Sequence, residues 1–429
     1  MVQTTHRPGS RPAASDKPRP MRIALISVHG DPLMPIGAEE AGGQNVYVLE
    51  VARALTRLGH SVDVYTRGRA HDRVEVIPHG GGRVIRLPAG PRGFVPRRDL
   101  FGHLPEFLQN MRSFVRHDGA RYGAIHSNYW LSGWVAREWA KERGVAHLHT
   151  HHSLGAVKFE AMGRIPAHGH MRLAVEAALI ERCEAVIATS PEDVMSMERH
   201  YGTPGNAVIV PCGVDQKEFR PREPDREALG IPDDGALLAY VGRFDPNKGI
   251  ETFVRSAAIA HEAHPVRLVF AGGFEPGAGD SDEHSRIRSL VEELGLSERA
   301  HFLGRVERER LPEVYAAADV CVVPSRYESF GLVAVEAMGC GTPVVASETG
   351  GLRYSIVHRE TGLLAPPGDH EAFASAIGLL LDDPALRASM GLAASRLVGR
   401  MFTWSAVARR LESVYASFVP SVQGAGASA

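Results

Sequence analysis

The chain of 429 residues has few cysteines and no long apolar run. Its four cysteines are far apart, at spacings that fit neither a metal-binding motif nor a disulfide framework. No stretch approaches the roughly 18 consecutive apolar residues that a membrane-spanning helix requires. The first 20 residues contain no apolar signal segment. We therefore expect a reduced, cytoplasmic protein that is neither secreted nor membrane-spanning.

The chain also has no large excess of positive or negative charge. The 48 lysines and arginines nearly balance the 50 aspartates and glutamates, giving a formal net charge of −2. A strongly basic surface for nucleic acid is therefore disfavoured. The 45 glycines and 28 prolines stay below the share of roughly 25–30% that marks low-complexity chain. At roughly 150 residues per domain, the length predicts two or three domains.

Short apolar runs alternate with longer amphipathic segments in two successive series. The first series predicts a helix over residues 44–58 and strands at residues 22–28, 61–66, 124–127, 146–150 and 184–189. The second predicts helices from residue 250, near residues 285–294 and from residue 330, with strands at residues 237–241, 267–271 and 319–324. This alternation indicates an α/β fold with two doubly wound parallel sheets.

A proline-rich segment, residues 211–235, interrupts the alternation and marks a domain boundary. We expect two domains over residues 21–211 and 212–402, a helix over residues 403–420, and disordered tails at residues 1–20 and 421–429. The last helix carries apolar residues at helical spacing: Trp404, Val407, Leu411 and Tyr415. Doubly wound sheets bind ligands at the carboxyl ends of their strands, so the site should draw residues from both halves.

A glycine-rich turn follows the first predicted strand. Gly42 and Gly43 stand just before a helix start, where exposed amides and the helix dipole favour an anion. The segment lacks both the GxGxxG spacing of dinucleotide sites and the lysine of a P-loop. Taken alone, it is equally consistent with an ordinary turn.

Two further motifs follow strands of the second half. Arg243 and Lys248 lie five residues apart on a turn, where they can hold a diphosphate or remain solvated charges. Glu328 precedes a predicted helix and Glu336 rides on it, so the two carboxylates can bind sugar hydroxyls and a ribose diol. The start of that helix offers amides to phosphate oxygens, over Ser329, Phe330, Gly331 and Leu332.

Together, Arg243, Lys248, Glu328 and Glu336 resemble the donor site of retaining glycosyltransferases of the GT-B fold, family 4. In that family the Arg and Lys bind the donor diphosphate, the second Glu binds the ribose, and the first lies against the donor sugar. The resemblance implies two Rossmann-like domains facing a cleft, with a C-terminal helix that crosses back to the first. It implies a nucleotide-sugar donor, with a UDP-sugar favoured over a GDP- or ADP-sugar, no tightly bound cofactor and no protein-bound metal. The need for Mg²⁺ and the formation of a homodimer stay open.

The N-terminal half is most similar to sucrose-phosphate synthases and to the inositol-phosphate N-acetylglucosaminyltransferase of mycothiol synthesis. The resemblance is carried by residues 41–48, 90–100, 126–133 and 151–158. By position it implies that His152 contacts the donor sugar and that the acceptor is held by Asn45, Arg97, Tyr129, Ser153 and Arg172. The mycothiol enzymes have Met at Gln44, Lys at Arg97 and Thr at Ser153. Because a cation and a hydroxyl are kept, we expect a small anionic acceptor of the inositol phosphate or sugar phosphate type.

The expected catalysis is electrostatic. Arg243, Lys248 and the amides near Gly43 would stabilise the leaving nucleoside diphosphate. The resemblance implies attack by the acceptor hydroxyl from the leaving-group face, with a donor phosphate oxygen taking the proton. For His152 we favour a sugar contact over base catalysis. A zinc site is disfavoured in the histidine cluster because carboxylate and cysteine partners at ligand spacing are missing; its members are His147, His149, His151 and His152.

Other functions stay open at this stage. One alternative is a glycosyltransferase of an antibiotic or other secondary-metabolite pathway, whose acceptor carries no phosphate. A sugar-nucleotide epimerase, a phosphorylase and a non-catalytic nucleotide-sugar-binding protein are the others. The phosphorylase lacks support because no pyridoxal-lysine signature is found, and a dehydrogenase is disfavoured because GxGxxG is missing.

Overall fold

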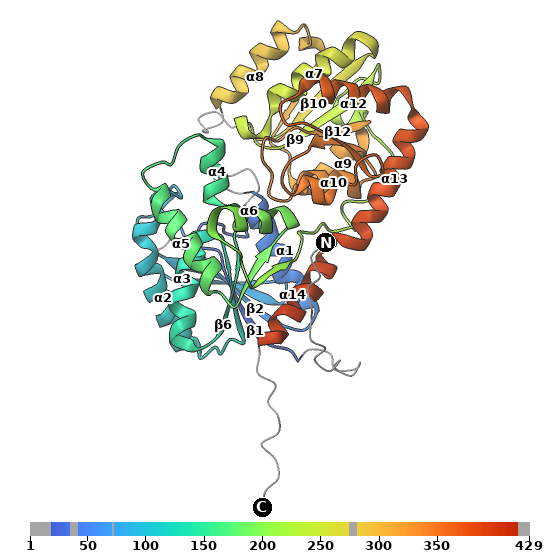
Figure 1. Cartoon of the computed structure of the whole chain (residues 1–429). Helices are drawn as coiled ribbons and strands as arrows, with labels where there is room; N and C mark the ends of the chain where they lie inside the picture. Colours follow the sequence, from blue (N-terminus) through green and yellow to red (C-terminus); the bar gives the residue numbers. More distant parts are fainter. Residues whose placement is uncertain (1–18, 35–41, 71–72, 274–280, 419–429) are drawn as a thin grey trace, which may run out of the picture.

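Two β-sheets, each covered by helices, organise the chain (Figure 1). The computed structural model describes residues 19–34, 42–70, 73–273 and 281–418. We call β1–β8 with their helices the N-terminal lobe, and β9–β14 with helices α7–α13 the C-terminal lobe. The expected tails at residues 1–20 and 421–429 lie outside the described residues, apart from residues 19 and 20.

The N-terminal lobe contains an eight-stranded sheet in the order β3-β4-β2-β1-β5-β6-β7-β8. All pairings are parallel except the β3–β4 hairpin. Its strands are β1 (Arg22–Ile26), β2 (Ser61–Gly68), β3 (Glu75–His79), β4 (Gly82–Pro88), β5 (Ala124–Asn128), β6 (Ala146–Thr150), β7 (Ala185–Ala188) and β8 (Ala207–Ile209). Its helices are α1 (Gly43–Arg57), α2 (Leu104–Asp118), α3 (Tyr129–Arg143), α4 (Gly155–Ala161), α5 (Gly169–Arg182) and α6 (Pro191–Tyr201).

The C-terminal lobe contains a six-stranded parallel sheet in the order β11-β10-β9-β12-β13-β14. Its strands are β9 (Ala236–Val241), β10 (Val266–Ala271), β11 (Ala300–Gly304), β12 (Val320–Val323), β13 (Val344–Ser347) and β14 (Gly362–Ala365). The helices that follow are α7 (Ile250–Ala263), α8 (Ser281–Glu293), α9 (Leu311–Ala317), α10 (Leu332–Gly339), α11 (Leu352–Ser355), α12 (His370–Asp382), α13 (Pro384–Met401) and α14 (Trp404–Phe418).

The predicted fold class is confirmed, and so are most of the predicted elements. The strand over residues 146–150 is β6, and helix α1 buries Val48, Val51 and Leu55 against the sheet. The helix expected from residue 330 was placed two residues too early: α10 begins at Leu332, because Gly331 has a φ of +91° that helical residues do not adopt. The predicted strands omit six of those observed: β3, β4, β8, β11, β13 and β14.

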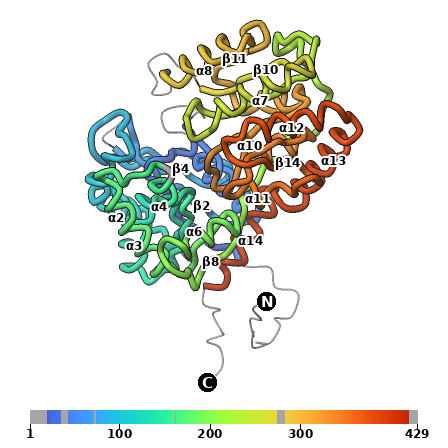
Figure 2. Tube along the Cα trace, turned by 45° about the horizontal axis from the view of Figure 1, so that its top comes forward, coloured from blue at the N-terminus to red at the C-terminus, as the bar shows by residue number. Residues whose placement is uncertain are grey.

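Helix α14 leaves the C-terminal lobe and packs on the N-terminal lobe against α1 (Figures 1 and 2). Its apolar face is almost completely buried, through Trp404, Val407, Leu411 and Tyr415. The chain passes between the lobes twice, once after β8 and once before α14. These two segments pair at a parallel bridge between Val214 and Thr403. The lobes are therefore joined by a paired connection rather than by a single linker.

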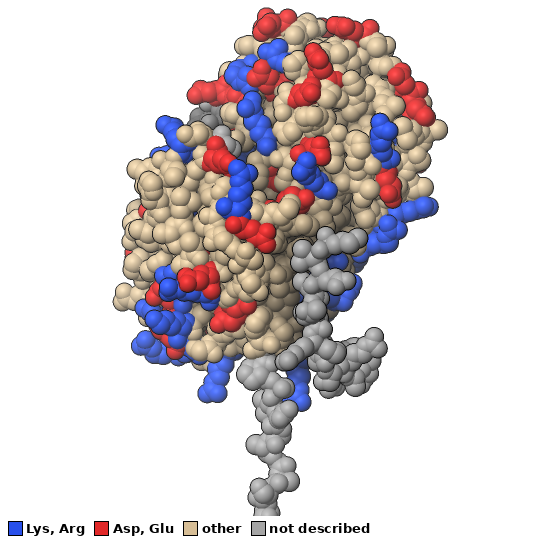
Figure 3. Space-filling model, in the orientation of Figure 1, with Lys and Arg blue, Asp and Glu red and all other residues tan. Residues whose placement is uncertain are grey.

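Basic and acidic side chains are interspersed on the face that Figure 3 shows, as the balanced composition predicts. Within the described ranges, no helix is both long and apolar enough to cross a membrane.

Candidate active site

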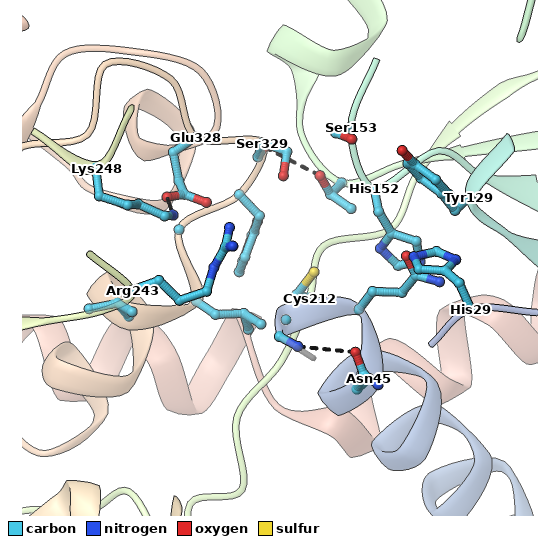
Figure 4. A pocket seen from close by; sticks show the side chains of 18 of the residues that line it. His29, Asn45, Tyr129, His152, Ser153, Cys212, Arg243, Lys248, Glu328 and Ser329 are labelled. Carbon is cyan, nitrogen blue, oxygen red and sulfur yellow. Dashed lines mark hydrogen bonds and ion pairs between the residues drawn. The ribbon is translucent and has the colours of Figure 1, made fainter. Parts of the chain in front are cut away.

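A cavity of about 310 Å³ lies between the two lobes (Figure 4). Most residues singled out from the sequence line it: Gly42, Gly43, Asn45, Arg97, Tyr129, His152, Ser153, Arg243, Lys248, Glu328, Ser329, Phe330, Gly331 and Leu332. Arg172 and Glu336 do not, although each lies close behind the wall. The carboxyl end of the first sheet thus faces that of the second across this space.

Two cations line the cavity on the side of the C-terminal lobe. Arg243 follows strand β9, its side chain is half-exposed, and its Nη2 lies 3.6 Å from Asp245 Oδ2. Lys248 closes the short turn after it, where its Nζ lies 2.6 Å from Glu328 Oε2. Glu328 also accepts a hydrogen bond of 3.3 Å from Ser325. An anion entering here would compete with carboxylates for both cations.

The loop before α10 presents backbone amides to the cavity as well as side chains. A Cβ atom at Gly331 would lie 2.5 Å from Leu352, and its φ of +91° disfavours any other residue. The chain can therefore turn sharply here and expose the first amides of α10, which have no partner within the helix. Leu332 and Val333 line the cavity at this point, so amides and helix dipole both favour an anion.

Glu336 lies one turn further along α10, beside an adjoining cavity of about 180 Å³. Its side chain is buried, and its two oxygens accept hydrogen bonds from Arg308 at 2.6 Å and from Tyr315 at 3.0 Å. This second space shares Arg243 and Lys248 with the first. The two cavities therefore meet at the cations.

The acceptor wall predicted from the sequence is held together by Arg172. This buried guanidinium bonds Glu176 through Nε at 2.7 Å, the Tyr129 hydroxyl through Nη1 at 3.1 Å, and Ser153 through Nη2 at 2.7 and 3.2 Å. Each of its nitrogens is engaged. Arg172 therefore fixes Tyr129 and Ser153, which are the residues that reach the cavity.

Asn45 and Arg97 belong to the same side. The Asn45 amide donates to the Asp31 carbonyl at 2.8 Å, and its Oδ1 accepts from the Gly42 amide at 3.0 Å, which shapes the start of α1. The Arg97 guanidinium stands 5.9 Å from the centre of the Tyr129 ring.

His152 adopts a left-handed conformation, with a φ of 59°. Its Nε2 lies 2.9 Å from Asn128 Oδ1, and its ring meets Tyr47 edge-on at 4.8 Å. Burial, followed by nearby His126 and His151, lowers the pKa of His152 to about 3. The imidazole is therefore neutral near pH 7.

The structure adds residues that the motifs did not indicate. His29 lines the cavity with its ring 4.7 Å from Tyr129, and its buried Nδ1 has no hydrogen-bond partner among the described residues. Burial, and then Arg97, keep its pKa well below the usual value. Gln44, Thr189 and Cys212 also line the cavity, and Thr189 Oγ1 donates to Ser329 O across the lobes at 3.3 Å. The only sequence signal for His29 is its place directly after the first strand.

Lys158, on α4, adds positive charge near this wall. Lys158 is an exposed residue, yet partial desolvation, followed by the neighbouring Arg97 and Arg172, lowers the pKa of its ammonium. It stands at the end of the 151–158 segment that carried the sequence resemblance.

The remaining histidines of the cluster form a buried network. Ser127 Oγ lies 2.7 Å from both His147 Nε2 and His149 Nδ1, and His149 Nε2 lies 3.2 Å from His151 Nδ1. Burial lowers the pKa values of His147 and His151 to about 3. Over the described residues, no three His, Cys, Asp or Glu side chains are grouped to hold a metal ion. These contacts cross-link β5 and β6 behind the cavity.

Comparison with known proteins matches both halves of the chain to family models. Residues 41–218 match Glycosyltransferase Family 4, and residues 221–396 match Glycosyl transferases group 1. D-inositol 3-phosphate glycosyltransferase of Corynebacterium diphtheriae is 38% identical over 410 residues, covering 92% of this chain and 94% of that protein. The enzyme of the same name from Acidothermus cellulolyticus is 39% identical and covers 86% of this chain.

Solved structures show the same similarity. Sucrose-phosphate synthase from Thermosynechococcus elongatus is 43% identical, with a TM-score of 0.85 over 92% of this chain and 98% of that one. Anabaena HepE, solved in complex with UDP-glucose, is 20% identical with a TM-score of 0.74 over 92% of this chain, a likeness of fold alone.

Proposed function

The chain belongs to the family 4 glycosyltransferases of the GT-B fold, and we propose that it transfers a hexosyl or N-acetylhexosaminyl group from a UDP-sugar to a small phosphorylated acceptor. It is a hexosyltransferase that uses a nucleotide sugar. The names of the relatives, D-inositol 3-phosphate glycosyltransferase and sucrose-phosphate synthase, support an acceptor of the inositol phosphate or sugar phosphate class.

The observation that carries this proposal is the presence of cations on both sides of one cavity. Arg243 and Lys248 stand on the C-terminal side, and Arg97 stands on the N-terminal side with Lys158 nearby. A nucleotide sugar brings a diphosphate and a phosphorylated acceptor brings a second anion. Two separate cationic sites match these two groups better than they match a neutral acceptor.

On the donor side, the diphosphate takes over the cations that carboxylates now hold. Lys248 exchanges Glu328 for a phosphate oxygen, and Arg243 exchanges its longer contact with Asp245. The amides at the start of α10 and near Gly43 add further positive potential. As the bond between the anomeric carbon and the diphosphate oxygen breaks, the negative charge that develops on that oxygen is stabilised by these groups.

On the acceptor side, the hydroxyls of Tyr129 and Ser153 and the guanidinium of Arg97 bind the phosphate, with Arg172 holding the first two in place. The acceptor hydroxyl attacks from the face that the diphosphate leaves, a bond forms from its oxygen to the anomeric carbon, and its proton passes to a donor phosphate oxygen. Attack from that face retains the anomeric configuration.

The test is a donor-by-acceptor screen by mass spectrometry, with and without Mg²⁺. UDP-, GDP- and ADP-glucose and UDP-N-acetylglucosamine are paired with inositol 3-phosphate and fructose 6-phosphate, and with inositol and fructose as matched controls. We expect transfer from a UDP-sugar, with kcat/KM at least roughly 100-fold higher for a phosphorylated acceptor, the effect of one or two charge-assisted hydrogen bonds. Equal rates with the unphosphorylated partners would contradict the proposal, and isomerised donor without acceptor would favour an epimerase.

A further inference from the structure

Asn128 lies directly behind His152 and is not part of the cavity lining. It is the last residue of β5 and is 1% exposed. Its Nδ2 lies 3.4 Å from the Ile26 carbonyl at the end of β1, and its Oδ1 lies 2.9 Å from His152 Nε2. The side chain thus bridges the central strand of the sheet and the histidine of the cavity wall.

The contacts of Asn128 with Ile26 and His152 determine which atom carries the hydrogen in each of them. A backbone carbonyl only accepts, so the Asn128 amide nitrogen must face Ile26, since the opposite orientation would place two oxygens together. The amide oxygen therefore faces His152, and the hydrogen between them is carried by His152 Nε2. A neutral imidazole carries one hydrogen, so the lone pair lies on Nδ1.

His152 Nδ1 makes no hydrogen bond with the described residues. The ring lines the cavity, and Tyr47 packs against it edge-on. The hydrogen bond to Asn128 and the edge-on contact with Tyr47 together hold the orientation of the His152 ring. His152 Nδ1 is therefore available to a bound ligand as a hydrogen-bond acceptor.

We propose that Asn128 is a positioning residue that holds His152 in the tautomer with its hydrogen on Nε2, so that Nδ1 accepts a hydrogen bond from one hydroxyl of the donor sugar. The inference rests on the proposed function. In this proposal His152 accepts a hydrogen bond from the sugar, and Asn128 holds it in the tautomer that can do so.

The surroundings of His152 determine how a charge at position 128 would act. Tyr47 of α1, His29 after β1, His126 of β5 and the adjacent His151 are its titratable neighbours. Arg243, Lys248 and Glu328 line the same cavity from the C-terminal lobe. Burial lowers the pKa values of His126 and His151 to about 3, so both are neutral above pH 5. Burial also lowers the pKa values of His29 and of the nearby His149 well below the usual value.

The first experiment compares Asn128→Asp with wild type across pH. The carboxylate keeps an acceptor for Nε2 but raises the pKa of His152 towards its ordinary value near 6.5. Below that pH, Nδ1 of the variant is protonated and no longer accepts. The carboxylate also loses the hydrogen bond to the Ile26 carbonyl, so each protein is compared with itself across pH. We expect kcat/KM for the donor to fall at least tenfold more between pH 8 and pH 5 in the variant than in wild type. The matched control is Asn110→Asp, because the Asn110 amide also donates to a backbone carbonyl, that of Pro88 at 2.8 Å, outside the site.

The second experiment uses Asn128→Leu and monodeoxy analogues of the accepted donor. Wild type should lose roughly tenfold in kcat/KM when one particular sugar hydroxyl is missing, the usual worth of one hydrogen bond. The Leu variant should lose this discrimination, with its KM for the complete donor raised about tenfold. A melting curve shows whether the variant folds.

A third readout does not depend on activity. Long-range ¹H–¹⁵N spectra distinguish the two histidine tautomers, and His152→Gln identifies the signal of His152 among the 21 histidines. A hydrogen on Nδ1 in wild type, or an Asn128→Asp pH profile identical to that of wild type, would overturn the proposal. Failure of wild type to transfer sugar from any donor would instead refute the proposed function and leave the tautomer measurement standing.

Discussion

Lys248 and Glu328 form a 2.6 Å ion pair at the cavity wall, and the neighbouring Arg243 is half-exposed with only a long contact to Asp245. Neither cation supports the core, so removing one should affect catalysis and not folding. Partly exposed ion pairs contribute little to stability. These side chains are available for a ligand because the fold does not depend on them.

Replacing Arg243 or Lys248 with Ala should each lower kcat by roughly 10²–10³, the usual cost of one contact to a developing oxyanion. The double variant should show no measurable transfer. Thermal unfolding should change little in all three. The control is Arg199→Ala, which removes an exposed arginine of α6 that pairs with Glu160 of α4. Full activity in the double variant would rule out the assigned diphosphate site.

Single residues also mark the limit of sequence interpretation at the site. Arg243, Lys248 and Glu328 could be predicted because each follows a strand in a motif with chemical meaning. His29 and Asn128 could not, because their roles depend on partners that the fold brings from elsewhere: Tyr129 for His29 and His152 for Asn128. The spacing of residues along the sequence also does not show that the guanidinium nitrogens of Arg172 already donate to Glu176 and Tyr129.

At the scale of elements, helix α14 supplies a buried polar contact to the other lobe. The Tyr415 hydroxyl lies 2.7 Å from His126 Nδ1, while His126 Nε2 meets Thr150 Oγ1 at 2.8 Å. All three residues are buried. The contact therefore ties the last helix to β5 and β6 through a fully satisfied imidazole.

Tyr415→Phe should destabilise the protein by about 1–3 kcal/mol, because it leaves a buried nitrogen of His126 without a partner. Urea unfolding measures the loss, and donor KM should stay unchanged. Tyr354→Phe is the matched control, since its ring packs against Phe402 and its hydroxyl makes no hydrogen bond with the described residues. Equal stability of the two variants would contradict the expected role of the contact.

Elements differ in how clearly the sequence predicts them. Mostly apolar runs predict the strands β1, β9 and β10, which are buried on both faces. Strands β5 and β6 are equally buried but carry histidines, so their apolar signal is shorter. The hairpin strands β3 and β4 lie at a sheet edge, and β3 alternates between partly buried and exposed positions, so its apolar signal is weak. Strands β13 and β14 are only four residues long, too short for a clear period.

At the scale of the whole molecule, a set of buried neutral histidines links stability to pH. Burial lowers the pKa values of His126, His147, His151 and His152 to about 3. In the unfolded chain the same groups titrate near 6.5. Between these values the unfolded state binds protons that the native state does not, so stability must fall as the pH drops below about 6.5.

We expect the free energy of unfolding to decrease between pH 6.5 and pH 5 by up to about 1.4 kcal/mol per pH unit for each such histidine. Two carboxyl groups act in the opposite direction: burial raises the pKa of Asp193 to about 6 and also raises that of Glu218, but the four histidines outnumber them. Urea unfolding at pH 7 and pH 5 measures the difference. His126→Gln should reduce the slope by about one proton, and a stability independent of pH over this range would contradict the expectation.

The bridge between Val214 and Thr403, together with the buried face of α14, has a consequence for the order of events during synthesis. The residues that complete the interior of the first lobe are translated after the entire second lobe. A nascent chain on the ribosome would therefore present an N-terminal lobe with an uncovered apolar surface until α14 emerges. A product truncated before α14 would be damaged in the lobe that is synthesised first.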